Sequence, residues 1–119
     1  MVEKVKELEK ILCGLTEHEV QEKIELLSPI KIGTVIRSKL NIEGRGETLA
    51  LSKVKEMKMN KDGDLCARYS VIEFSGKKIE FTEEKIFSPL ELLLSDEEVE
   101  VISHDEWERM VNVFNCLKK

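Results

Sequence analysis

Apolar residues recur at steps of three and four over residues 1–28, and this spacing predicts two amphipathic helices. Gly14 is typical of the position just past a helix end. Thr16 and Glu19 form a capping box that predicts the start of the second helix, and Pro29 excludes the helical conformation from the residue before it. We therefore predict a helical hairpin over residues 1–28. Its apolar stripes are Val2, Val5, Leu8, Leu12 and Leu15 in the first helix and Val20, Ile24 and Leu27 in the second.

The apolar period changes to two after Pro29, which is typical of half-buried strands. The first strand is predicted over residues 30–40. Turn sequences at residues 43–47, 60–64 and 75–77 separate it from the strands that follow, so consecutive strands should pair as hairpins. We predict an antiparallel meander of four or five strands, curved into a small, half-open, barrel-like sheet.

One phase change inside this region predicts an irregularity in the second strand. Leu49 and Leu51 fall out of phase with Val54, and an extra residue in one strand would restore a common apolar face. We therefore predict a β-bulge near Ser52.

The last third of the chain returns to a helical period. Residues 83–94 fit either a helix or a strand, and we leave both open; residues 99–102 are predicted to form a short strand. A second capping box begins at Ser103 and predicts a final helix over residues 104–119 that packs on the sheet. Its apolar face is made of Trp107, Met110, Val111, Phe114 and Leu117.

These elements predict an α+β fold in a single domain over residues 1–119. Its parts are the helical hairpin at 1–28, a mainly β region at 29–103 and the carboxy-terminal helix at 104–119. A length of 119 residues is close to the commonest domain size and is enough to bury one core.

Several observations bear on where the protein resides. No apolar run approaches the roughly 20 residues that cross a bilayer, and the first four residues lack the basic start and apolar stretch of a secretory signal. The three cysteines are an odd number at wide spacing, which disfavours a disulfide framework. We expect a cytoplasmic protein that does not associate with membranes.

Charge is uneven along a chain whose net charge is −5. Residues 30–80 carry eleven Lys or Arg against seven acids, whereas residues 81–119 carry four against ten. A basic sheet can follow a phosphate backbone, although Tyr69 is predicted to face the core, where it could not stack on a base. The candidate nucleic-acid contacts are Arg37, Arg45, Lys53, Lys55 and Lys58.

The amino-terminal helices suggest a different surface, because a short amphipathic hairpin must bury its stripe against something. It packs either on the sheet of its own chain or on another chain, which would be a second copy or a protein partner. The residues that would form such an interface are Val5, Leu8, Leu12 and Val20.

Candidate chemistry is sparse. His18 and His104 are the two histidines, neither lies in a recognised catalytic motif, and their distances to the cysteines match no zinc spacing. We expect no catalytic residue, no metal site and no cofactor; an enzyme would require reacting acids that folding brings together. An acidic cluster also lies near the carboxy terminus, formed by Asp96, Glu97, Glu98, Glu100, Asp105, Glu106 and Glu108.

The sequence therefore leads to three functional hypotheses. The favoured one is a non-enzymatic protein–protein interaction or adaptor module that acts by surface complementarity, as a homodimer or with another protein. The second is a nucleic-acid-binding regulatory domain that uses the basic strand region. The third is an acidic inhibitor, or nucleic-acid mimic of the mobile-element type, that uses the acidic cluster.

Overall fold

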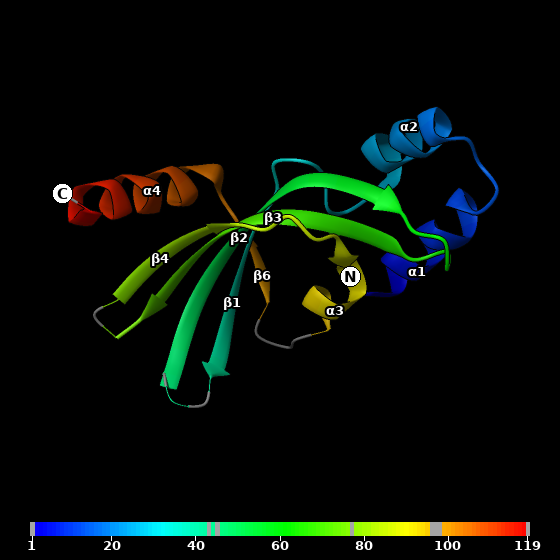
Figure 1. The fold of residues 1–119 in the computed structure, drawn as a ribbon. Helices are drawn as coiled ribbons and strands as arrows, with labels where there is room; N and C mark the ends of the chain where they lie inside the picture. Colours follow the sequence, from blue (N-terminus) through cyan, green and yellow to red (C-terminus); the bar gives the residue numbers. More distant parts are fainter. Residues whose placement is uncertain (1, 43, 45, 77, 96–98, 119) are drawn as a thin grey trace.

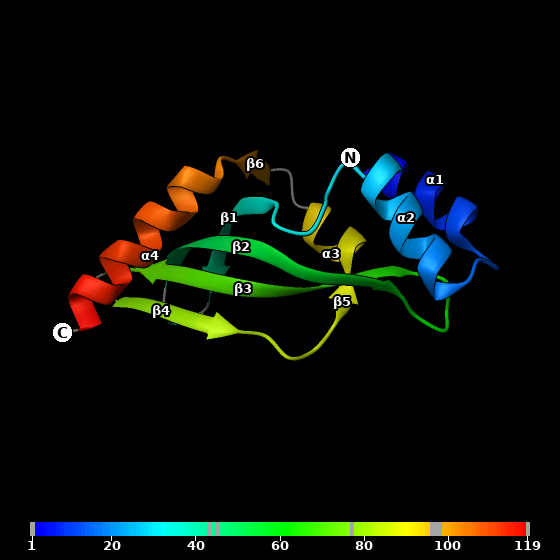
Figure 2. The ribbon, with the colours of Figure 1, turned by 90° about the horizontal axis from the view of Figure 1, so that it is seen from above.

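The computed structural model of the chain describes residues 2–42, 44, 46–76, 78–95 and 99–118 (Figure 1). Helices gather at the two ends of an elongated sheet, with both amino-terminal helices at one end and the carboxy-terminal helix at the other (Figures 1 and 2). In chain order the elements are α1 (Val2–Leu12), α2 (Glu17–Leu27), β1 (Val35–Ile42), β2 (Gly46–Met59), β3 (Leu65–Ser75), β4 (Lys78–Glu83), β5 (Ser88–Pro89), α3 (Leu90–Leu94), β6 (Glu100–Ile102) and α4 (His104–Lys118).

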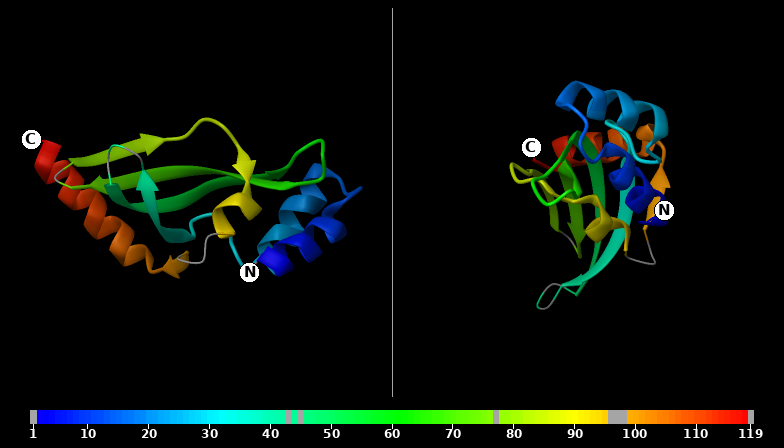
Figure 3. Two further views of the ribbon diagram at one scale, coloured as in Figure 1. Left: turned by 90° about the horizontal axis from the view of Figure 1, so that it is seen from below. Right: turned by 90° about the vertical axis from the view of Figure 1, so that its right-hand side faces the viewer.

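The six strands form one antiparallel sheet in the order β4-β3-β2-β1-β6, and β5 pairs with β3 outside this path. The predicted α+β class, the helical hairpin and the carboxy-terminal helix on the sheet are confirmed. The sheet is curved but open, and it does not close into a barrel. Figure 3 shows the long strands β2 and β3 running through the whole length of the molecule.

Local chemistry explains several element ends. The amide of Glu19 donates to the Thr16 hydroxyl at 3.3 Å and the Thr16 amide donates to the Glu19 carboxylate at 3.3 Å, so the predicted capping box begins α2. At the β2–β3 turn, the side-chain oxygen of Asn60 accepts from the amides of Asp62 and Asp64. Gly63 there has φ +84°, which a residue with a Cβ rarely adopts.

The first strand begins later than predicted. Residues 30–34 form a loop in which Gly33 has φ +94° and its amide bonds to the carbonyl of Val54, and regular pairing of β1 starts at Val35. Ile30 is nevertheless fully buried, so its apolar character reports packing rather than strand structure.

The bulge lies between Val54 and Glu56, not near Ser52. Leu51 and Val54 are out of phase because helices cover both faces of the sheet: Leu51 packs with α4 and Val54 packs with the amino-terminal helices. The bulge after Val54 places Val54 and Met57 on the same face although they are three residues apart, and both are buried there.

The core is divided by the sheet into two clusters. The larger lies under α1, α2 and α3; the smaller lies under α4, where Trp107 is buried with Val35, Leu51 and Ile72. The rings of Trp107 and Phe81 are 6.1 Å apart, which anchors α4 on the β4 side of the sheet.

The segment left open by the sequence contains both kinds of element. β4 runs to Glu83, the two-residue strand β5 pairs with Cys66 and Ala67, and the short helix α3 follows. Leu90 and Leu94 of α3 are buried, which explains the helical stripe in this part of the sequence.

Candidate binding groove

A hollow lies on the sheet face opposite α4, next to the short helix α3. Its volume is about 320 Å³, and strands β1, β2 and β3 supply its floor. We call this hollow the sheet groove. The side chains that line it are Ser38, Ala50, Ser52, Tyr69, Val71, Glu73, Glu84, Ser88, Leu92 and Leu93.

Short side chains at neighbouring cross-strand positions form the floor of the groove and leave space above the strands. Ser38 on β1 lies directly opposite Ala50 on β2, and Ser52 on β2 lies directly opposite Val71 on β3. All four are buried, yet none fills the space above it as a leucine or phenylalanine would. Farther along this face Val54 and Met57 pack against the amino-terminal helices.

Tyr69 carries the most distinctive chemistry of the groove. The side chain is only 4% exposed, and its hydroxyl has no hydrogen-bond partner among the residues that the structure describes. Burial raises the pKa of the phenol above its ordinary value, and the negative charge of Glu84 raises it further. A buried hydroxyl without a partner costs stability, so this one calls for an explanation.

Glu84 is held beside Tyr69 by the backbone. Its amide donates a 2.9 Å hydrogen bond to the Tyr69 carbonyl just after the end of β4, and its own carbonyl accepts from Arg68 at 3.2 Å. The Glu84 side chain is exposed at the wall of the groove. The groove therefore combines a neutral phenol with a carboxylate.

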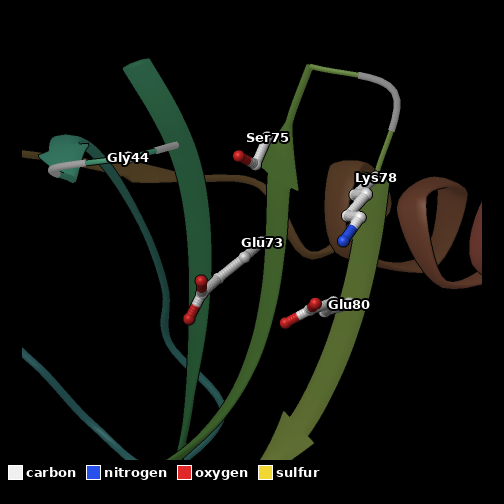
Figure 4. A pocket seen from close by; sticks show the side chains of 5 residues that line it. All are labelled: Gly44, Glu73, Ser75, Lys78 and Glu80. Atoms are coloured by element: carbon white, nitrogen blue, oxygen red, sulfur yellow. The ribbon is translucent and has the colours of Figure 1, made fainter. Parts of the chain in front are cut away.

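A second hollow of about 260 Å³ continues the groove toward the hairpin ends, because Glu73 lines both. In Figure 4, Glu73 on β3 and Glu80 on β4 reach toward the viewer's side of the sheet, while α4 lies behind it. The two glutamates are direct cross-strand partners, and Lys78 lies on the same strand as Glu80. The lining residues are Gly44, Glu73, Ser75, Lys78 and Glu80.

Thr48 adds a second buried hydroxyl on this face. It lies on β2 in phase with Ala50 and Ser52, directly opposite Ser75, and is fully buried. Its hydroxyl has no partner in the described part of the chain. Of these two buried hydroxyls, that of Tyr69 belongs to a residue that lines the groove, whereas Thr48 lines neither hollow.

The described basic candidates make contacts at two separate places along the sheet. Arg37 forms ion pairs with Glu100 and Glu106, and the Lys53 ammonium lies 6.0 Å from the ring centre of Trp107, under α4. The Lys58 ammonium instead lies 4.1 Å from the ring centre of Phe87, near the other end of β2.

The remaining two basic candidates are Lys55 and Arg45. Lys55 is exposed at the bulge, and Arg45 lies outside the described residues. The pairing of Arg37 also involves two members of the predicted acidic cluster, Glu100 and Glu106. Three further members, Asp96, Glu97 and Glu98, lie outside the described residues.

The amino-terminal hairpin packs on its own sheet, which is one of the two arrangements left open by the sequence. The four candidate interface residues are at most 6% exposed and belong to the chain's own core. The Glu9 carboxylate accepts from the Leu65 amide at 2.7 Å, and Gln21 donates to the Met57 carbonyl at 2.9 Å, so polar contacts also fix the hairpin to β2 and β3. These interface residues are Val5, Leu8, Leu12 and Val20.

Both histidines lie on helix surfaces. His18 is 3.0 Å from Glu22 and His104 is 3.6 Å from Glu108, each pair at the four-residue spacing of one helix face. Within the described residues, no three His, Cys, Asp or Glu side chains gather as metal ligands would. No helix of that part of the chain is long and apolar enough to cross a membrane.

Sequence reasoning placed Tyr69 in the core but missed the groove. The available signal was serine at apolar-phase positions of β1 and β2, at Ser38 and Ser52, because a strand that is buried on both faces seldom carries small polar residues at inward positions without a reason. The missing partner of the Tyr69 hydroxyl cannot be read from any local pattern.

Comparison with known proteins leaves the groove to be interpreted on its geometry. No protein-family model, no curated protein and no solved structure matches this chain.

Proposed function

We propose that the protein is a non-enzymatic binding module that holds a segment of a partner protein in the sheet groove. One observation carries the proposal: Tyr69 lines a hollow of about 320 Å³, and its buried hydroxyl has no hydrogen-bond partner within the described chain. A bound segment that reached this hydroxyl would supply the missing hydrogen bond, which is worth more in a dry site than in water.

The shape of the site supports a polypeptide as the occupant. The two hollows adjoin at Glu73 and extend from α3 toward the β3–β4 hairpin, so the site is longer than a single side chain requires. At the α3 end, Leu92 lines the groove and is 69% exposed. Exposed apolar residues beside a polar hollow are typical of recognition sites.

The chemistry of the groove favours recognition over catalysis. Its described ionisable groups are the carboxylates of Glu73 and Glu84 and the phenol of Tyr69, whose raised pKa keeps it protonated at neutral pH. These groups can accept and donate hydrogen bonds, while a nucleophile activated by a neighbouring base would need a different set. We extend the proposal to a cytosolic location, where the free thiols of Cys13, Cys66 and Cys116 would persist.

The proposal is tested by selecting peptides from a phage-displayed random library on the immobilised full-length protein. Selected peptides are then titrated into ¹⁵N-labelled protein, and we expect the largest amide shifts at Ala50, Ser52 and Val71. The variant Ala50→Leu fills the floor and should weaken binding at least tenfold, whereas Leu26→Ser, on the exposed surface of α2, should not.

A second groove variant guards against a folding defect in Ala50→Leu. Leu92→Ser changes an exposed side chain and should weaken binding without loss of stability. Peptides that shift only amides outside the groove, such as those around Ile32, would contradict the proposal, as would a library that yields no enriched peptide. Selected peptides that match a segment of this chain would identify the partner as a second copy.

A further inference from the structure

Two residues whose side chains can accept hydrogen bonds, Tyr69 and Glu84, line the sheet groove together with Leu92 and Leu93 of α3. The Tyr69 oxygen has no hydrogen-bond partner among the described residues, and the exposed residue Glu84 is the backbone neighbour of Tyr69, because its amide donates a 2.9 Å hydrogen bond to the Tyr69 carbonyl. A group that donates to both would satisfy the phenol oxygen and neutralise the carboxylate. Ammonium and guanidinium groups are donors of this kind.

The remaining surface of the groove is apolar enough to hold an aliphatic stem. Val71 forms part of the floor of the groove. Leu92 and Leu93, which belong to α3, form part of its wall. Lysine and arginine side chains place an apolar stem on such a surface and keep the charged end at a polar site. The ring of Tyr69 adds a face that attracts a cation.

The sign of the charge agrees with this occupant. Of the described residues that line the groove, the two that carry charge at neutral pH are both acids, Glu73 and Glu84. The adjoining hollow adds Glu80 and one cation, Lys78. At the exposed residue Glu84, a partner that brought a carboxylate or phosphate would meet a like charge, whereas a basic partner would meet the opposite charge.

We propose that the partner segment inserts a lysine or arginine side chain into the sheet groove, where its charged end donates to Tyr69 and Glu84 and its stem packs on Val71, Leu92 and Leu93. This inference rests on the proposed binding function and adds the chemical class of the residue that is recognised.

The test uses two small probes of equal chain length, hexylammonium and 1-hexanol, titrated separately into the full-length ¹⁵N-labelled protein at neutral pH. We expect both to shift amides of the groove floor and hexylammonium to bind about tenfold more tightly, since a hydrogen bond to a charged group exceeds a neutral one by at least that factor. The preference should shrink at 0.5 M salt because the Glu84 carboxylate is exposed.

Two glutamate variants serve as a matched pair. Glu84→Gln keeps the shape and removes the charge, and we expect the preference for hexylammonium to fall to about twofold or less. Glu83→Gln makes the same change one residue earlier, at an exposed position that does not line the groove, and should leave the preference intact. An equal loss in both variants would overturn the inference.

The outcomes separate the inference from the proposed function. Equal affinity of the two probes, or binding of neither, would overturn the basic-residue inference. The binding function is judged separately by the peptide selection: enriched peptides that occupy the groove and lack Lys and Arg would leave that function standing and overturn the inference.

Discussion

The Glu84 amide donates a 2.9 Å hydrogen bond to the Tyr69 carbonyl, and this contact places Glu84 next to the one tyrosine of the chain. The bond lies just beyond the end of β4, one residue after Glu83 pairs with Ser70. The chain then turns away through residues 85–87 to β5 and α3, which leaves the groove between α3 and the sheet. The position of Glu84 is thus set by the strand end, independently of its side chain.

Removing the orphan hydroxyl should stabilise the protein. Tyr69→Phe keeps the ring in the core and eliminates a buried polar atom that has no partner within the described chain. We expect the free energy of unfolding in urea to rise by about 1 kcal/mol, toward the low end of the cost of an unsatisfied buried group. Binding of a groove ligand should weaken at the same time, which is the expected trade between stability and function.

The control for this change is Tyr69→Ala, which removes the buried ring as well. It should lower the free energy of unfolding by about 3–5 kcal/mol, as large-to-small changes of aromatic core residues do. A loss of stability in Tyr69→Phe as large as that of other core changes would show that the hydroxyl makes a hydrogen bond in the folded protein. That result would remove the main observation in favour of ligand binding in the groove.

Alkaline pH should destabilise the fold through Tyr69. Its pKa is raised in the folded state, so the folded chain retains a proton that the unfolded chain releases above about pH 10. The stability that this proton represents is complete below pH 10 and is lost as the pH rises further. Above pH 10 we expect the free energy of unfolding to fall more steeply in the natural chain than in Tyr69→Phe. The difference between the two slopes should reach up to about 1.4 kcal/mol per pH unit.

Absorbance provides a direct check of this pH dependence. Because the chain has one tyrosine, the tyrosinate band reports Tyr69 alone. In urea titrations at pH 11 the band should appear together with unfolding, which is measured in parallel by the fluorescence of the single tryptophan, Trp107. Growth of the band at pH 11 ahead of the change in Trp107 fluorescence would mean that the pKa of the phenol is not raised in the folded protein.

The helical hairpin should depend on its buried face alone. Leu8→Ala removes a side chain that is 3% exposed in the core and should cost about 2–5 kcal/mol of the free energy of unfolding. Ile11→Ala, three residues along the same helix, changes a side chain that is 51% exposed and should cost under about 1 kcal/mol. Equal effects in urea titrations would contradict docking of α1 on the sheet.

Local patterns sufficed for the elements of the fold because each pattern has a local cause. The capping box of Thr16 and the turn at residues 60–64 satisfy backbone groups within five residues, so they can be recognised without tertiary context. The bulge could not be placed in this way. The phase change between Leu51 and Val54 has a tertiary origin, since α4 covers one face and the amino-terminal helices cover the other.

The groove could not be predicted from the sequence, because its lining also depends on tertiary structure. Its lining joins Ser38, Val71 and Leu92, which come from two strands and a helix far apart in the chain. The Tyr69 hydroxyl has no hydrogen-bond partner in the described fold. A sequence pattern indicates which contacts a residue can make, but it does not indicate which contacts the fold leaves unmade. The burial of the apolar stripe of the helical hairpin could be predicted, because packing on the chain's own sheet was one of only two arrangements considered.

The basic strand residues offer a final test, since sequence reasoning connected them with nucleic acid. Phosphate binding requires cations that are free to exchange counterions, and here Arg37 is shared by Glu100 and Glu106 while Lys53 lies over the Trp107 ring. We expect labelled 20-nucleotide single strands of DNA and RNA to bind no more tightly than about 10⁻⁴ M at 0.15 M salt by fluorescence anisotropy, the weak end of non-specific binding. A dissociation constant near 10⁻⁷ M that rises steeply with salt would instead indicate that the strand region binds nucleic acid. In that case Lys55→Glu on β2 should abolish binding, and the control Lys10→Glu on α1 should retain it. Both lysines are exposed, but only Lys55 belongs to the basic strands.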